Sequence, residues 1–260
     1  MYKKIALITG GCGLLGWEYA KSLNEINCKV IILDNNFSKI KERKLLLEKL
    51  NLDIEIYKSD ITSEKNLKIT IKKIISKYKN IDILINNAAV DFKPLKKNIK
   101  IKNHFLDFDL KRWESELSVG LTGPFLCSKE IGKFMVKKNY GIILNIASDL
   151  SIIAPDQNLY KHLNAFKPVS YSVIKHGIHG LTKYLAALWA PFNIRVNTLS
   201  PSGVQTNQDK TFIKKIKKLI PMKRMAKLNE YNEAIKYLCS DKSTYLTGQN
   251  IIIDGGRTII

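Results

Sequence analysis

A tyrosine and a lysine four residues apart are the strongest candidates for chemistry in this sequence. Lys175 follows Tyr171 in YSVIK, so on a helix the two side chains lie on one face, one turn apart. An ammonium there stabilises a phenolate and lowers the phenol pKa from about 10, which lets a tyrosine act as acid or base. Tyr160 has Asn164 at the same spacing. We therefore predict that Tyr171 does the chemistry; the alternative is a half-buried ring whose hydroxyl bonds a neighbour.

A serine at the end of an apolar run is the second candidate. Ser148 follows residues 141–147, a predicted strand, and its hydroxyl would bond the substrate oxygen and place it beside Tyr171. The alternative is a polar residue that only ends the strand. His176 and His179 are predicted to pack or to face solvent rather than to bind a ligand, and we predict no metal site.

A glycine-rich segment, TGGCGLLG at 9–16, lies between the first apolar run and a helix-like stretch. Gly10 or Gly11 would allow the tight turn, while Gly13 would let the backbone approach a pyrophosphate and Gly16 would permit close packing of the helix. The amino terminus of that helix then offers free N–H groups to phosphates. The pattern predicts dinucleotide binding by Gly10, Gly13, Leu15 and Gly16.

A carboxylate ends the second apolar run, VIILD, about twenty residues past the glycines. There Asp34 would accept both hydroxyls of the adenosine ribose and would repel a 2′-phosphate, which favours NAD over NADP. Lys39 and Lys41 follow it, but no cation is directly adjacent. The alternative is an aspartate that caps the next helix.

Seven short apolar runs alternate with longer helix-like stretches along the chain. Near-continuous Val, Ile and Leu indicates strands buried on both faces, hence a parallel sheet covered by helices. This rhythm predicts an α/β fold with a Rossmann-type, doubly wound sheet of about seven strands. No linker or repeat interrupts it, so we predict a single domain over residues 1–260. The predicted strands are residues 5–8, 30–33, 54–57, 83–86, 141–147, 194–200 and 250–254.

The composition is strongly basic, with 43 Lys and Arg against 23 Asp and Glu and a net charge of +20. Such a charge could serve a nucleic acid or a membrane surface, but the lysines are spread over amphipathic stretches such as 39–50, which indicates solvated helix faces. We therefore predict no nucleic acid and no membrane as partner, and the positive field could instead attract an anionic small-molecule substrate. The four cysteines include no CxxC pair, which indicates free thiols and a cytoplasmic protein.

Seven motifs spread over almost the whole chain resemble the short-chain dehydrogenase/reductase family. They are TGGCGLLG at 9–16, SDIT at 59–62, NNAA at 86–89, IAS at 146–148, YSVIK at 171–175, RVNTLSPSGVQT at 195–206 and YLTGQNIIIDGG at 245–256. The resemblance implies that Ser148, Tyr171 and Lys175 are catalytic and that the protein is a homodimer or homotetramer. It also implies cofactor contacts from Asp60, Ile61, Asn87, Ala88, Tyr171, Lys175, Pro201, Val204 and Thr206.

Four phrases resemble a narrower bacterial group, the oxidoreductases associated with flagellin modification and nonulosonate sugar pathways. They are SDLSIIAPDQ, KPVSYSVIK, IPMKRMAK and IDGGRTI. This resemblance implies a sugar or sugar-phosphate substrate in surface-glycan biosynthesis.

Two positions depart from the family pattern. Leu14 stands where many single-domain members carry glycine, and the loop follows the TGxxGxxG spacing of the larger sugar-nucleotide epimerases and dehydratases. Gly120 stands where the family commonly has an asparagine, which is implied to hold a water between the catalytic lysine and solvent. A backbone carbonyl or another water would have to complete such a relay, or proton release would be slow.

Three segments are predicted to border the substrate. Residues 91–107 and 149–170 follow strands, so both would project from the carboxyl edge of the sheet, and the second would wall the pocket. Residues 207–220 are amphipathic and form a candidate lid, whose lysines either bind a phosphate or face solvent.

These patterns together predict an NAD-dependent oxidoreductase that transfers a hydride between the nicotinamide and a secondary alcohol or ketone of sugar type. Two alternatives stay open. One is a cofactor-binding protein without dehydrogenase activity, suggested by Gly120, and the other is a nucleotide-sugar epimerase.

Overall fold

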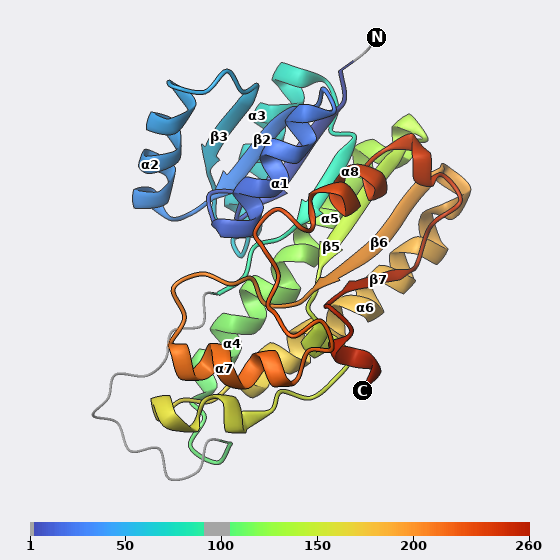
Figure 1. The fold of residues 1–260 in the computed structure, drawn as a ribbon. Coiled ribbons are helices and arrows are strands. Elements are labelled where there is room, and N and C mark those ends of the chain that lie inside the picture. The colour runs from blue at the N-terminus through green and yellow to red at the C-terminus, as the bar shows by residue number, and fades with distance from the viewer. Residues whose placement is uncertain (1–2, 91–104) are drawn as a thin grey trace.

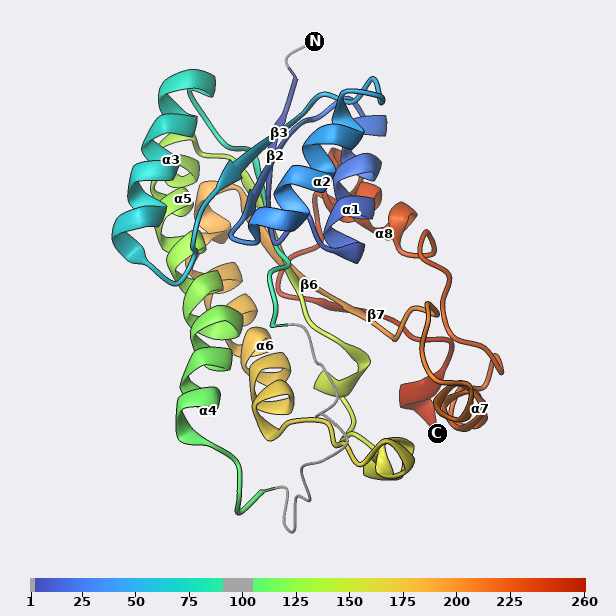
Figure 2. The ribbon, with the colours of Figure 1, turned by 90° about the vertical axis from the view of Figure 1, so that its left-hand side faces the viewer.

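One parallel sheet of seven strands forms the centre of the computed structural model, which describes residues 3–90 and 105–260. The strand order is β3-β2-β1-β4-β5-β6-β7, with helices on both faces (Figures 1 and 2). The predicted fold class is confirmed, and each predicted strand is present within a few residues of its expected ends. The strands are β1 Ile5–Thr9, β2 Lys29–Asp34, β3 Ile54–Lys58, β4 Ile83–Asn86, β5 Gly141–Ile146, β6 Ile194–Pro201 and β7 Asn250–Ile253.

The first strand shows why the apolar runs lack alternation. Ala6 and Ile8 belong to the apolar cluster on one face of the sheet, whereas Ile5 and Leu7 belong to the cluster on the other face. All four are buried, because successive side chains of a strand point to opposite faces and helices cover both.

The helices form two layers, which Figure 2 shows on either side of the sheet. Helices α1 and α8 pack together over one face, near α2, while α3, α5 and α6 cover the other. Within residues 3–90 and 105–260, no helix combines the length and apolar character that crossing a membrane requires. The helices are α1 Leu14–Glu25, α2 Phe37–Leu47, α3 Glu64–Tyr78, α4 Leu110–Leu117, α5 Gly123–Lys138, α6 Val169–Trp189, α7 Lys210–Lys218 and α8 Asn232–Leu238.

Local sequence fixes where several helices begin. The side chain of Asn36 accepts the Lys39 N–H at the start of α2, and Ser63 does the same for Asn66 at the start of α3. Such caps satisfy N–H groups that have no partner inside the helix. Each cap therefore sets the length of the loop that precedes it at the carboxyl edge of the sheet.

The segment predicted to wall the pocket packs against the predicted lid. Residues 149–170 contain three short 3₁₀ turns, Asp149–Ser151, Gln157–Leu159 and Lys161–Leu163. Apolar side chains of this segment and of α7 form a third cluster at the carboxyl edge. His162 Nε2 lies 2.6 Å from Asp209 Oδ1 at the start of α7. Of the other predicted segment, 91–107, residues 91–104 lie outside the described residues.

Candidate active site

A cavity of about 1030 Å³ opens at the carboxyl edge of the sheet. Its walls come from the ends of β1 to β6, the start of α6 and the loop before α7. The structure brings every predicted site residue into this wall. These residues are Gly10, Gly13, Leu15, Gly16, Asp34, Asp60, Ile61, Asn87, Ala88, Ser148, Tyr171, Lys175, Pro201, Val204 and Thr206.

The glycine loop is built by close backbone approaches. Gly10 has a φ of +62° and takes the tight turn that the sequence left open between Gly10 and Gly11. A Cβ atom on Gly16 would lie 2.6 Å from the carbonyl oxygen of Gly10 and 2.7 Å from Asn87 Nδ2. Gly13 caps α1 without a side-chain hydrogen bond, so the first N–H groups of that helix point from the loop with no side-chain acceptor.

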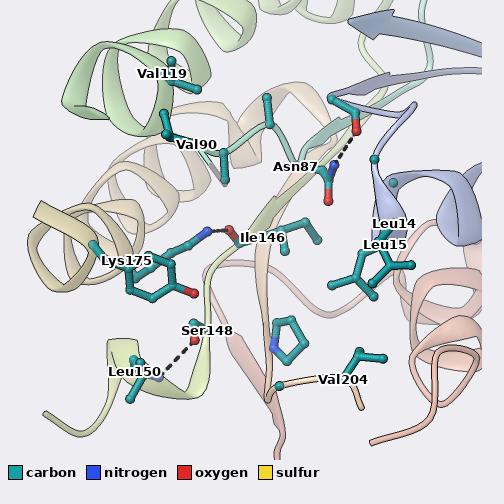
Figure 3. A pocket seen from close by; sticks show the side chains of 18 of the residues that line it. Leu14, Leu15, Asn87, Val90, Val119, Ile146, Ser148, Leu150, Lys175 and Val204 are labelled. Atoms are coloured by element: carbon teal, nitrogen blue, oxygen red, sulfur yellow. Dashed lines mark hydrogen bonds between the residues drawn. The ribbon is translucent and has the colours of Figure 1, made fainter. Parts of the chain in front are cut away.

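Asn87 ties this loop to the end of β4. Its Nδ2 donates to the backbone oxygens of Thr9 and Gly10 at 3.0 and 3.2 Å, and Figure 3 draws one of these two bonds. In return, the Thr9 hydroxyl accepts the N–H groups of Asn87 and Ala88, each at 3.1 Å. Thr9 is a positioning residue that sequence reasoning missed, although it opens the glycine motif.

The carboxylate of Asp34 holds the loop to the end of β2. One oxygen accepts the Cys12 N–H at 3.1 Å and the other accepts the Asn36 N–H at 2.9 Å. The alternative that Asp34 caps a helix is wrong, because Asn36 caps α2. Each carboxylate oxygen has further acceptor capacity, and Asp34 lines the cavity.

Asp60 is committed to its own turn. Its Oδ1 accepts the N–H and the hydroxyl of Thr62 at 2.9 and 2.7 Å, while the Asp60 N–H donates to Asn66. The neighbouring Ile61 is buried beside Gly123. Asp60 and Ile61 both line the cavity, but one oxygen of the Asp60 carboxylate is already bonded to Thr62.

The predicted catalytic side chains converge from β5 and α6. Ser148 follows β5, whereas Tyr171 lies in the first turn of α6 with Lys175 one turn further. The side chains of Ser148, Tyr171 and Lys175 all line the cavity. Lys175 Nζ lies 5.7 Å from the centre of the Tyr171 ring and donates to the Ile146 carbonyl at 2.8 Å (Figure 3).

Burial dominates the pKa values of Tyr171 and Lys175. Burial raises the pKa of Tyr171 to about 12, and the Ser148 side chain opposes this only in part. Burial also lowers the pKa of Lys175 to about 8, assisted by the like charge of Lys167. Desolvation penalises both ions, and the ammonium donates to the Ile146 carbonyl, so the lowering of the phenol pKa by Lys175 stays a prediction.

The second tyrosine also reaches the cavity but has different neighbours. Tyr160 packs against Phe212 of α7, with ring centres 5.6 Å apart, and belongs to the apolar cluster there. Burial raises its pKa to about 12.

The two histidines near Tyr171 in the sequence bond protein groups. His176 bonds the Ser172 carbonyl, and His179 bonds the Ser151 hydroxyl. In the described part of the chain, no group of three or more His, Cys, Asp or Glu could hold a metal ion.

The space beside Gly120 is filled by an isoleucine. Gly120 lies in a π-helical turn, Ser118–Thr122, between α4 and α5. A Cβ atom there would lie 2.5 Å from Ile174 Cγ2 and 2.9 Å from Ile174 Cδ1. An asparagine therefore has no room at this position unless Ile174 moves.

Three charged residues at the cavity wall were not singled out from the sequence. Lys167 Nζ lies 3.6 Å from the centre of the Tyr171 ring, while Asp149 and Arg257 form a buried ion pair next to Ser148. Asp149 and Arg257 are 108 positions apart, so no local pattern could join them.

A doubly wound sheet with these groups at its carboxyl edge places the chain among the oxidoreductases of alcohols and ketones. It belongs to the short-chain dehydrogenase/reductase family: a family model described as enoyl-(acyl carrier protein) reductase matches residues 13–258.

Individual proteins agree with this assignment. The chain is 33% identical to the NAD-dependent glycerol dehydrogenase of Listeria innocua, over 98% of this chain and 94% of that protein. It is 31% identical to the post-translational flagellin modification protein A of Campylobacter coli, over 97% of each. A gluconate 5-dehydrogenase from Burkholderia cenocepacia, solved with NADP and tartrate, superposes with a TM-score of 0.85 at 25% identity, covering 100% of this chain and 97% of that one.

The contact between Gly120 and Ile174 generates a stability prediction. Gly120→Ala should lower the free energy of unfolding by about 1 to 3 kcal/mol, because the added methyl group overpacks the buried isoleucine. Gly180→Ala is the matched control, since it lies in α6 with no atom within 4 Å of its Cβ position and alanine favours a helix. Urea unfolding of both variants provides the measurement, and equal stabilities would contradict the packing described here.

Proposed function

We propose that this chain is an NAD-dependent dehydrogenase/reductase in which Ser148, Tyr171 and Lys175 act on a secondary alcohol or ketone. The observation that carries this proposal is the meeting of these three side chains in the cavity that also contains the glycine loop. The spacing of Tyr171 and Lys175 on α6 supports their roles, and so does the effect of Ser148, which opposes the rise that burial causes in the pKa of Tyr171.

The residues present fit a nicotinamide dinucleotide. Gly10, Gly13 and Gly16 leave a loop without side chains beside an uncapped helix amino terminus, a combination suited to a pyrophosphate. When bound, the dinucleotide would supply the hydride acceptor or donor. The residues that would hold it are Gly10, Gly13, Leu15, Gly16, Asp34, Asp60, Ile61, Asn87, Ala88, Tyr171, Lys175, Pro201, Val204 and Thr206.

The role of each chemical group follows from its surroundings. The Ser148 hydroxyl would bond the substrate oxygen, and Tyr171 would exchange a proton with that oxygen. Because burial favours the neutral phenol, Tyr171 holds the proton that a ketone oxygen needs when it is reduced. The Lys175 ammonium would stabilise the phenolate left after that transfer.

NAD is the proposed cofactor because of Asp34. Its carboxylate ends β2 and lines the cavity, where it would accept ribose hydroxyls and repel a 2′-phosphate. The relation to an NAD-dependent glycerol dehydrogenase supports this choice. The gluconate 5-dehydrogenase solved with NADP shows that the fold also accepts the other cofactor, so the choice rests on Asp34 and needs a direct test.

A sugar-type substrate is proposed from the relatives. Glycerol and gluconate, named for two of them, are polyhydroxylated, and the flagellin modification protein supports a sugar or sugar phosphate in surface-glycan biosynthesis. Assays of such compounds with NAD separate three functions. NADH formation supports the dehydrogenase, a new sugar without NADH accumulation supports an epimerase, and cofactor binding without turnover supports a binding protein.

Four free cysteines, all buried, support a reducing, cytoplasmic location for the protein.

Replacing the proposed acid tests the mechanism. Tyr171→Phe should reduce kcat by about 10² to 10⁴, because it removes proton transfer while retaining the ring. Tyr160→Phe is the matched control and should keep most of the activity, since the Tyr160 ring packs against Phe212 of α7 and phenylalanine retains that ring. Steady-state NADH absorbance measures turnover, and calorimetric titration checks that both variants bind NAD. Full turnover by Tyr171→Phe would remove this residue from the mechanism.

Replacing the proposed ribose ligand tests cofactor choice. Asp34→Ser should improve the Kd ratio in favour of NADP by about tenfold, or about 1.4 kcal/mol, because it removes the charge that opposes a 2′-phosphate. Asp53→Ser is the control, since Asp53 pairs with Lys3 and Lys29 on the surface. Fluorescence titration with both reduced cofactors gives the ratio, and an unchanged preference for NAD would refute the role of Asp34.

We also propose a homodimer or homotetramer that pairs the outer faces of α5 and α6. Phe125, Tyr184 and Leu188 are exposed there, at 50%, 67% and 49%, and an apolar patch of this kind is typical of a protein interface. Tyr184→Glu should lower the mass measured by light scattering, whereas Tyr237→Glu on α8 should leave it unchanged. A monomeric native protein would disprove this assembly.

A further inference from the structure

Two of the segments that resemble the flagellin-modification group, SDLSIIAPDQ and IDGGRTI, meet in the structure. Each contributes a charged residue that has no role in the proposed function. SDLS contributes Asp149, directly after Ser148, and IDGGRTI contributes Arg257 in the carboxyl-terminal turn Arg257–Ile259. Arg257 Nη1 lies 2.7 Å from Asp149 Oδ2. Both residues are buried, at 3% and 7% exposure.

Asp149 is fully engaged. Its Oδ1 accepts from the Ser148 hydroxyl at 2.8 Å and the Leu150 N–H at 2.9 Å, while its Oδ2 accepts from the Ser202 hydroxyl at 2.9 Å and from Arg257. A carboxylate can only accept hydrogen bonds. Ser148 therefore donates its single proton to Asp149, and its oxygen accepts from the Leu150 N–H at 3.2 Å. A substrate oxygen or the Tyr171 phenolate would compete with Asp149 for that proton.

Stability alone does not account for a charged pair here. Burying two ions costs free energy, and apolar residues of similar volume often replace such a pair without loss of stability. Among the described residues, Arg257 Nε is also buried without a hydrogen-bond partner, which adds to the cost. Asp149 directly follows Ser148, a proposed catalytic residue. At this place the charge of the pair and the hydrogen bond of Asp149 can act on the Ser148 hydroxyl.

We propose that Asp149 and Arg257 are a positioning pair: Asp149 sets the direction of the Ser148 hydroxyl, and Arg257 holds and neutralises Asp149. This inference rests on the proposed function of Ser148 and Tyr171. It makes the carboxyl-terminal turn a part of the active site, although no atom of the turn needs to touch the substrate.

The backbone around Arg257 is shaped for this contact. Gly255 and Gly256 have φ values of +66° and +87°, and Asp254 accepts the N–H groups of Gly256 and Thr258 at 2.9 and 2.7 Å. A Cβ atom on Gly256 would lie 3.0 Å from Pro221. This tight turn directs Arg257 toward Asp149 rather than toward solvent.

The charges around the phenol make the proposal testable. Asp149 raises the pKa of Tyr171 and Arg257 lowers it, so that the two effects oppose each other. Among the described residues, Tyr160, Lys167 and Lys175 also face Tyr171. Tyr160 and Tyr231 also face Asp149.

The experiment follows the ionisation of Tyr171 in single and double variants. Asp149→Asn leaves the Arg257 cation unbalanced and frees the Ser148 proton for the phenolate, so the titration should move down by about one pH unit. Arg257→Gln leaves the Asp149 anion unbalanced, so it should move up by a similar amount. The double variant should return close to the wild-type value, and Arg257→Lys should restore it.

Two measurements report this shift. Ultraviolet difference absorbance, with the same variant carrying Tyr171→Phe as the blank, follows the phenol without any substrate. The pH profile of NAD reduction with glycerol as the trial alcohol follows it in turnover, because oxidation requires the phenolate and its rate should rise through the Tyr171 pKa. Arg224→Gln is the matched control, since it breaks the more exposed ion pair with Glu230 and should leave the titration unchanged.

A purely structural pair would lower thermal stability without moving the titration in opposite directions. The inference would be overturned if the Tyr171 phenol titrated at the wild-type pH in both single variants, or if its titration moved in the same direction in both. Should one single variant fail to fold, the other still decides the inference, because its titration must move in the stated direction while that of the double variant stays near the wild-type value. Full activity of Tyr171→Phe would instead refute the proposed function, and the difference titration would still report on the pair.

Discussion

Every functional group in this chain depends on one constraint of a parallel sheet: all of its strands end at the same edge. A helix returns the chain after each strand, so the segments that follow β1, β2, β3, β4, β5 and β6 are gathered there. Residues as distant in sequence as Gly10 and Thr206 thus line one cavity. Among the proposed site residues, Asp34 and Pro201 are the last residues of β2 and β6. The others lie in the segments that follow the strands, which the common strand direction brings together.

Polar contacts set the spacing at this edge. A buried chain of hydrogen bonds runs from Asn86 through Asn145 and Thr182 to Thr198, each at 2.8 Å, and joins β4, β5, α6 and β6. Unpaired polar groups in such a place would cost about 1 to 3 kcal/mol each, so the bonds favour one separation of α6 from β5. That separation fixes how far the start of α6 lies from Ser148.

The sequence predicted those features of the fold and site that depend on residues close together in the chain. Apolar runs located the strands, because burial on both faces leaves a mark within four to eight residues, and helical spacing placed Tyr171 and Lys175 together. The raised pKa of Tyr171 could not be predicted from the sequence, because the burial that causes it depends on packing by segments distant in the chain. The pair of Asp149 and Arg257 was equally hidden, because only the folded chain closes the 108 positions between them.

The contact between Gly120 and Ile174 limits which residues can occupy these two positions. An asparagine at 120 requires a smaller side chain at 174, whereas a smaller residue at 174 beside glycine would leave a void. Either step alone is penalised, so the two positions should covary among homologues. An asparagine at position 120 would therefore need a compensating change at position 174.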